Sequence, residues 1–256
     1  MTPKIGQLLQ PEHSFGLVAL SYFISFAGSL VALICARRMV GADGRANLAV
    51  VACAAVALGG IGIWSMHFIG MLAYRLPVSV MFNMPLTAVS LVAAILISGI
   101  ALYLAGGRQQ FSKAGWLAGS VLAGIGACVM HYLGMFAMNM RAAMEFNLAT
   151  VAVSAVIAIV AAGAALWLAF NLTKLVHQIG AAAVMGLAVC TMHYVGMSAA
   201  DMICTAAAPV DALAIGGSYM GLTVFGTAGA VLILIFWIVT SEGLDPLQPL
   251  VKTAHT

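Results

Sequence analysis

Long apolar stretches that contain no charged residue are the feature that most limits how this chain can fold. Of its 256 residues, 64% are hydrophobic and 7% are charged, whereas a soluble domain carries about 25% charged residues. So few charges cannot cover a surface that faces water. Each apolar run also approaches the ~20 residues that an α-helix needs to cross the hydrocarbon core of a bilayer. We therefore predict an all-α integral membrane protein with the lipid bilayer as its main surroundings.

Short polar breaks divide the apolar sequence into seven segments. The predicted transmembrane helices cover residues 14–36, 48–73, 84–106, 115–138, 148–171, 179–200 and 219–241. The breaks leave no room for a folded soluble domain, so we assign residues 1–245 to one membrane domain and residues 246–256 to a short cytoplasmic tail. The tail is too short for an output module, and the sequence has no Ser-His-Asp spacing and no phosphate-binding loop. We therefore predict that the chain is not an enzyme. The net charge of +3 is small, and we expect no nucleic-acid partner.

The positive residues lie mainly in the loops on one side of the predicted membrane domain. Seven of them fall on that side, namely Arg37, Arg38, Arg45, Arg108, Lys113, Lys174 and Lys252. Three fall on the other side, namely Lys4, Arg75 and Arg141. Short cytoplasmic loops of membrane proteins carry an excess of Lys and Arg. The N-terminus is therefore predicted outside and the C-terminus inside.

One motif occurs three times, near the ends of three predicted helices. The sequence reads MHFIGM from Met66, MHYLGM from Met130 and MHYVGM from Met192. Similarity continues beyond the first two copies, with FNMPLTAVS at Phe82 and FNLATVAVS at Phe146. A fixed spacing of this kind indicates an internal repeat. We predict a two-helix hairpin used three times as a parallel repeat, with the last helix closing the bundle.

The motif residues are candidate metal ligands. Within each copy the His and the second Met are four residues apart, so they share one helix face. The candidates are His67, His131 and His193 with Met71, Met135 and Met197, and Met66, Met130 and Met192 are second choices. Thioethers are soft ligands that favour Cu(I), imidazoles suit copper in both oxidation states, and carboxylates are missing from all three motifs. We predict a copper site near the outer face, with Cu(I) favoured.

Other interpretations of the motif remain open at this point. Haem is one alternative, because His and Met are also the axial ligands of electron-transfer haems. A copper carrier or assembly factor is another. A structural role is a third, because His can bond between membrane helices and Met is a common core residue. An ionisable residue inside a membrane helix is nevertheless a functional candidate by default. The sequence does not say whether the three motifs form one site or several.

The three motifs on alternate helices resemble the MHYT family of bacterial integral membrane sensor domains. The resemblance runs from about the first predicted helix to the sixth or seventh. It implies a copper site of Met and His near the outer face of the bacterial cytoplasmic (inner) membrane, which senses O2, CO, NO or a redox change. At the fourth motif position, where the family often has Thr, this chain has Ile69, Leu133 and Val195.

Many members of that family continue into cytoplasmic diguanylate cyclase, phosphodiesterase or kinase modules. This chain has only a short tail after residue 241. We therefore expect either an excised sensor domain or one that signals to a separate cytoplasmic protein.

A reporter fused to the C-terminus tests the predicted orientation. An enzyme that is active only in the cytoplasm should be active in this fusion, because the positive loops lie on the side of the C-terminus. An enzyme that is active only in the periplasm should be inactive there. The opposite pair of results would reverse the orientation and place the three motifs near the inner face.

Overall fold

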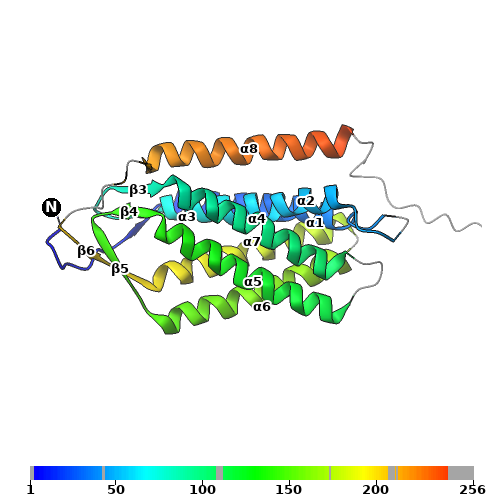
Figure 1. The fold of residues 1–256 in the computed structure, drawn as a ribbon, viewed down its shortest axis with the longest axis horizontal. Coiled ribbons are helices and arrows are strands. Elements are labelled where there is room, and N and C mark those ends of the chain that lie inside the picture. The colour runs from blue at the N-terminus through cyan, green and yellow to red at the C-terminus, as the bar shows by residue number, and fades with distance from the viewer. Residues whose placement is uncertain are drawn as a thin grey trace, which may run out of the picture.

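The computed structural model describes residues 3–41, 44–107, 112–172, 174–206, 211 and 213–241. It consists of long helices that lie side by side, with short strands gathered at one end (Figure 1). Six helical spans are long and apolar enough to cross a membrane: α1 (Phe15–Ala36), the rod Leu48–Ala73, α4 (Met84–Gly106), α5 (Lys113–Phe136), α6 (Leu148–Asn171) and α7 (Leu175–Ser198). The seventh helix is α8 (Gly217–Ser241). The predicted all-α membrane fold is confirmed.

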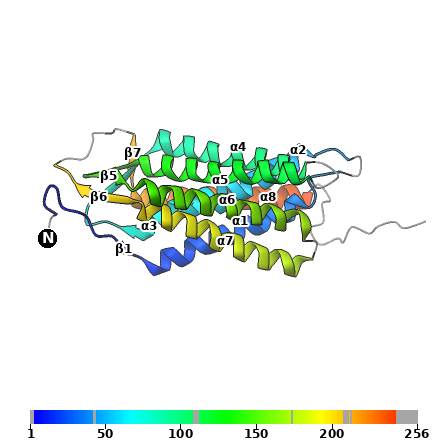
Figure 2. The same cartoon turned by 90° about the horizontal axis from the view of Figure 1, so that it is seen from below.

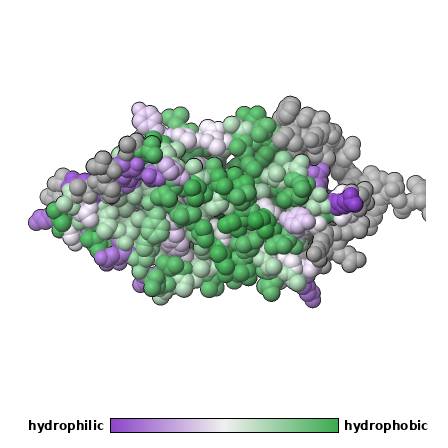
Figure 3. Space-filling model, in the orientation of Figure 1, coloured by the Kyte–Doolittle hydropathy of each residue, from purple (hydrophilic) through white to green (hydrophobic). Residues whose placement is uncertain are grey.

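The surface agrees with this assignment. A hydrophobic band crosses the middle of the face seen in Figure 3, and hydrophilic residues gather towards both ends. Among the exposed side chains are Val92, Leu96 and Ile100 on α4 and Val156 and Val160 on α6. Exposed aliphatic side chains along the middle of several helices are the surface that lipid covers in a membrane protein.

Two helices are shifted towards the N-terminus from their predicted positions. The predicted helix 115–138 begins at Lys113, where the Ser112 hydroxyl caps it by accepting from the backbone N–H of Gly115 at 3.2 Å. It ends at Phe136, and the predicted helix 179–200 is observed as Leu175–Ser198. Both end early because the residues that follow pair as strands.

The second predicted helix is one rod whose middle is wound more widely. It consists of α2 (Leu48–Ala55), the π-helix η1 (Val56–Ser65) and α3 (Met66–Ala73). Inside η1 the Ser65 hydroxyl donates to the carbonyl of Gly60 at 2.9 Å. Insertions of π-helix are rare and are frequent at functional sites. The apolar pattern of residues 56–65 predicts only a continuous helix, not this π-helix.

Glycines allow the helices to approach closely around η1. A Cβ added at Gly28 of α1 would lie less than 3.0 Å from the backbone of Gly62 in η1. A Cβ added at Gly59 would collide in the same way with the backbone of Ala94 in α4. Small residues permit such contacts between membrane helices, and the glycine-rich stretch before the first motif therefore serves helix packing.

Six helical rods form a closed ring, and α8 lies outside it. Each rod packs against the next in chain order, and α7 returns to pack against α1. The two lie side by side in Figure 2. The last helix, α8, packs instead against η1 and α3 on the outside of the ring (Figure 1). The prediction that the last helix closes the bundle is wrong, because α1 and α7 close the ring and the three hairpins form a complete unit without α8.

Short strands connect the hairpins at the end where α3, α5 and α7 finish, here called the motif end (Figure 1). All the pairings are antiparallel: β1 (Glu12–His13) with β2 (Tyr74–Arg75), β3 (Val80–Asn83) with both β4 (Met138–Met140) and β7 (Ala214–Gly216), and β5 (Ala142–Phe146) with β6 (Ala200–Cys204). Beside β3, the Asn83 amide donates to Asp211 at 2.7 Å, and this bond lowers the pKa of the Asp211 carboxyl. These strands were not predicted from the sequence.

Five of the eight described Lys and Arg residues lie at the end of the ring away from the motifs, and Lys4, Arg75 and Arg141 lie at the motif end. Arg37, Arg38 and Arg45 lie between α1 and α2, whereas Lys113 and Lys174 lie at the starts of α5 and α7. All five are at the end away from the motifs, as the predicted orientation requires. Arg108, Lys252 and the predicted tail 246–256 lie outside the described residues.

Candidate metal centre

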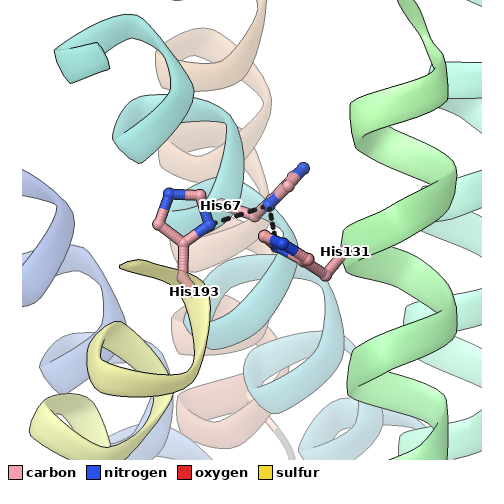
Figure 4. Close-up of side chains that lie close together, drawn as sticks. All are labelled: His67, His131 and His193. Carbon is pink, nitrogen blue, oxygen red and sulfur yellow. Dashed lines mark hydrogen bonds between the residues drawn. The ribbon is translucent and has the colours of Figure 1, made fainter. Parts of the chain in front are cut away.

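The three motif histidines meet at one point inside the ring. His67 comes from α3, His131 from α5 and His193 from α7, and none of the three is exposed (Figure 4). Nδ1 of His67 lies 3.0 Å from Nδ1 of His193 and 3.1 Å from Nδ1 of His131. One ring nitrogen from each histidine lies within 4.8 Å of the others. The repeats therefore form one site, which answers the question that the sequence left open.

The rings are held by contact with one another. The ring centroid of His67 lies 4.9 Å from the centroids of both His131 and His193, and the centroids of His131 and His193 are 5.2 Å apart. In all three pairs the rings meet edge to face. Each histidine sits in the last two turns of its helix. Because three equivalent helices end at the same level, the repeat carries the three imidazoles to one depth.

Each histidine also rests against the motif glycine of another copy. The pairs are His67 with Gly134, His131 with Gly196 and His193 with Gly70. In each pair a Cβ added to the glycine would lie less than 3.0 Å from Nε2 of the imidazole, closer than real Cβ atoms come. The three contacts run in a cycle around the site. Only glycine at this motif position leaves room for the neighbouring ring.

Nothing in the motif sequence alone assigns these three glycines a role. The signal that identifies them is their position, three residues after the histidine in every copy. A residue three positions from another on a helix lies on nearly the same face. Each glycine therefore faces the same interior as its own histidine.

The aromatic residue after each histidine packs edge to face against it. In the second and third copies this residue is a tyrosine that ties its helix to a neighbour. The Tyr132 hydroxyl lies 2.9 Å from Ser154 Oγ of α6, and the Tyr194 hydroxyl lies 3.2 Å from Ser21 Oγ of α1. These hydrogen bonds stabilise the depth and the rotation of α5 and α7.

In the first copy a different side chain makes the hydrogen bond to a neighbouring helix. Its aromatic residue is Phe68, which has no hydroxyl and packs against Phe82 with ring centroids 5.7 Å apart. Trp64, one turn earlier, donates instead from Nε1 to Ser90 Oγ of α4 at 3.0 Å. All three motif helices are therefore hydrogen-bonded to a serine of an adjacent helix.

Hydrogen bonding alone cannot satisfy the three imidazoles. A neutral imidazole has one N–H and one lone pair, so Nδ1 of His67 can pair properly with only one of the two Nδ1 atoms that it faces. The three Nε2 atoms are buried without a hydrogen-bond partner of normal geometry. His131 and His193 have only weaker interactions with the backbone of Gly196 and Gly70. Buried polar atoms without partners are rare and costly.

A metal ion fits this arrangement. Three nitrogens that each bind one ion at about 2.0 Å lie roughly 3.3–3.5 Å from one another. The observed Nδ1 separations of 3.0 and 3.1 Å are a few tenths of an ångström shorter. An ion at the centre would accept all three lone pairs at once, which one shared proton cannot do. Within the described part of the chain, these histidines are the only His, Cys or acidic side chains grouped closely enough to hold a metal.

The six candidate methionines are all buried next to this site in sequence. Met71, Met135 and Met197 lie one helical turn from their histidines towards the motif end, and each is at most 3% exposed. The second choices Met66, Met130 and Met192 are also buried. The ring nitrogens of the three histidines are close enough together to hold one ion, and the six methionines, each buried in the core, stay candidate ligands. Cys128 and Cys190 are outside the group of possible ligands.

The chain matches known bacterial signalling proteins. Residues 60–119 and 124–182 match the model of MHYT, described as a bacterial signalling protein N-terminal repeat. The chain is 39% identical over 199 residues to the bifunctional diguanylate cyclase/cyclic di-GMP phosphodiesterase MucR of Pseudomonas aeruginosa, covering 76% of this chain and 29% of that protein. It is 29% identical over 253 residues to the cyclic di-GMP phosphodiesterase NbdA of the same species, covering 94% of this chain and 31% of that protein.

The chain also matches a signalling protein from another bacterium. The signaling protein YkoW of Bacillus subtilis is 34% identical over 189 residues, covering 71% of this chain and 22% of that protein. The chain thus spans less than a third of the length of these relatives. No solved structure matches it. Since the repeat model matches twice and the relatives align across all or most of the ring, the chain belongs to the MHYT family of bacterial signalling proteins.

Proposed function

We propose that this domain is a membrane receptor that holds one copper ion between His67, His131 and His193 and senses a diatomic gas or a redox change there. The observation that supports it most directly is the convergence of three buried imidazoles: Nδ1 of His67 faces the Nδ1 atoms of both other rings, and all three Nε2 atoms lack a hydrogen-bond partner. The kinship with signalling proteins supports a role in sensing.

The choice of copper comes from the donor set. Three imidazoles suit zinc as well as copper. The thioethers of Met71, Met135 and Met197 are the additional ligands that favour copper, with Met66, Met130 and Met192 as second candidates. Neutral ligands add no negative charge to offset a second positive charge on the metal, and that charge is costlier at low dielectric. We therefore expect Cu(I) to be favoured over Cu(II).

The bound ion would supply an open coordination position for O2, CO or NO and a change of oxidation state. The chain supplies the enclosure and the coupling. Each histidine rests on the glycine of another motif helix, so any change in the spacing of the rings shifts α3, α5 and α7 relative to one another. The serine hydrogen bonds carry this shift to α4, α6 and α1.

The geometry argues against the two other functions considered. A haem needs a gap wide enough for a porphyrin beside its axial ligand, whereas these rings contact one another at centroid separations of 4.9–5.2 Å. A carrier that moves copper across the membrane needs a polar path through the other half. That half of the ring holds instead an apolar cavity, described below.

The proposed setting is the bacterial cytoplasmic membrane, with the motif end facing the periplasm. The output is then passed on at the opposite end, to a separate cytoplasmic signalling protein or to a linked module. MucR and NbdA are named for the synthesis or hydrolysis of cyclic di-GMP, and we propose a partner of that class. We propose no catalytic role for the described residues.

Replacing the three histidines tests the site itself. The triple variant His67→Ala, His131→Ala, His193→Ala removes all three nitrogen ligands. Its Cu(I) affinity should fall by more than about 100-fold, because removal of a residue that only orients a ligand already costs roughly 10–100-fold. Copper analysis and a chelator competition on purified protein measure this. His177→Ala, at an exposed position of α7, is the control and should bind copper like the parent. Full copper retention in the triple variant would contradict the proposal.

Enlarging a motif glycine tests whether its contact with the neighbouring imidazole positions that ring. Gly134→Ala places a Cβ against Nε2 of His67 and should lower Cu(I) affinity by about 10–100-fold without removing a ligand. Gly180→Ala is the matched control, because a Cβ there meets no atom within 4 Å. Equal affinities in the two variants would show that the glycine contact does not position the ring.

The thioethers are tested by the triple variant Met71→Leu, Met135→Leu, Met197→Leu. Leucine roughly keeps the volume and apolarity, so unfolding free energy should fall by about 1.5 kcal/mol or less per site. Cu(I) affinity should fall while zinc affinity changes little, because only copper gains from soft ligands. Unchanged Cu(I) affinity in a folded variant would mean that these methionines serve packing alone.

A further inference from the structure

A cavity lies inside the ring on the side of the histidines that faces away from the strands. Its volume is about 60 Å³, and it is lined by residues of α1, η1, α4, α5, α6 and α7. Ten of the 19 lining residues are alanine. Short side chains at these positions leave the middle of the ring unfilled, whereas protein interiors have few voids larger than a water molecule.

The cavity begins one helical turn from the three histidines. Its lining includes Ile63, Ala127 and Val189, which stand four residues before His67, His131 and His193 respectively. Residues four apart lie on one helix face, so the three helices present histidine and cavity lining in succession towards the axis of the ring. Met192, adjacent to His193, also lines the cavity. The metal centre is therefore the outer boundary of this space.

The lining selects an apolar occupant. Ser98 is the one residue with a hydroxyl among the described residues that form it, and the rest are Ala, Leu, Ile, Val and Met. An ordered water needs two to four polar partners, and cavities of this kind stay dry. One water-sized sphere takes about 10–15 Å³ on the same measure. A volume of about 60 Å³ therefore admits a molecule of a few heavy atoms.

We propose that this cavity binds a small uncharged molecule of the size of a diatomic gas and delivers it to the three histidines from within the membrane. Apolar gases are more soluble in hydrocarbon than in water, so the bilayer is the richer source for such a ligand. The delivery step rests on the proposed function. The binding step does not, because it needs no metal.

Ala127 is the position at which to test the cavity. It corresponds by repeat to Ile63 and Val189 and is the smallest of the three. Ala127→Ile inserts the residue that the first copy already has at this place, and it fills the space next to the histidines. Ala118→Ile makes the same change at an exposed position of the same helix and is the matched control. Ala162→Val on α6 is a smaller filling variant, for use if Ala127→Ile does not fold.

Xenon is the probe for binding, measured by 129Xe NMR on the full chain at one fixed detergent concentration. The parent and Ala118→Ile should show the same saturable shift, and the filling variants should lose it. Absence of a saturable shift in the parent, or its retention in the folded filling variants, would overturn the cavity as a binding site. Both outcomes are independent of copper.

Carbon monoxide recombination after flash photolysis tests delivery in the Cu(I)-loaded protein. The filling variants should rebind CO more slowly than the parent, whereas Ala118→Ile should not. Parental CO rates in a variant that has lost xenon binding would overturn delivery through the cavity. Saturable xenon binding in a protein that takes up no copper would contradict the proposed function and still support the cavity as a binding site.

Discussion

The contact of an imidazole with the backbone of a neighbouring helix is the constraint on which this structure depends. Nδ1 of His67 can lie 3.0–3.1 Å from the Nδ1 atoms of both His131 and His193 only if α3, α5 and α7 come very close together at one level. Glycine at the third position after each histidine makes this approach possible, since any side chain there would occupy the place of a ring. The motif is therefore one interlocking unit in which each copy supplies both a ligand and the space for another ligand.

The remainder of the fold keeps that unit in place. Because α1 and α7 close the ring, every motif helix has a neighbouring helix that carries a serine within hydrogen-bond distance. The serines lie on α4, α6 and α1, and their partners are Trp64, Tyr132 and Tyr194 respectively. Antiparallel pairing at the motif end joins the start and the end of each hairpin, β1 to β2, β3 to β4 and β5 to β6, and limits how far its two helices can slide. On the other side of the rings the small side chains leave an apolar space. The half of the ring next to the strands is thus linked by hydrogen bonds between helices, whereas the opposite half is less completely filled.

Much of this was predictable from the sequence because the bilayer simplifies the problem. Hydropathy and short polar breaks located every helix to within a few residues, as with Met84–Gly106 and Leu148–Asn171. The repeated motif identified the three histidines because ionisable side chains are rare in membrane helices. The π-helix Val56–Ser65 and the strands escaped prediction because they depend on contacts between distant segments, such as Gly28 against Gly62. The convergence of three histidines on one point escaped it as well, since spacing along a helix does not reveal how three helices are rotated about a common axis.

The central claim is that the three motifs form a single metal centre. The most direct test is the stoichiometry of Cu(I) binding to the purified chain, measured by titration against a chromogenic Cu(I) chelator under reducing conditions. We expect one tightly bound ion per chain, because the three imidazoles lie together at one point. Three equivalent ions per chain, one for each motif, or no bound copper at all would contradict it.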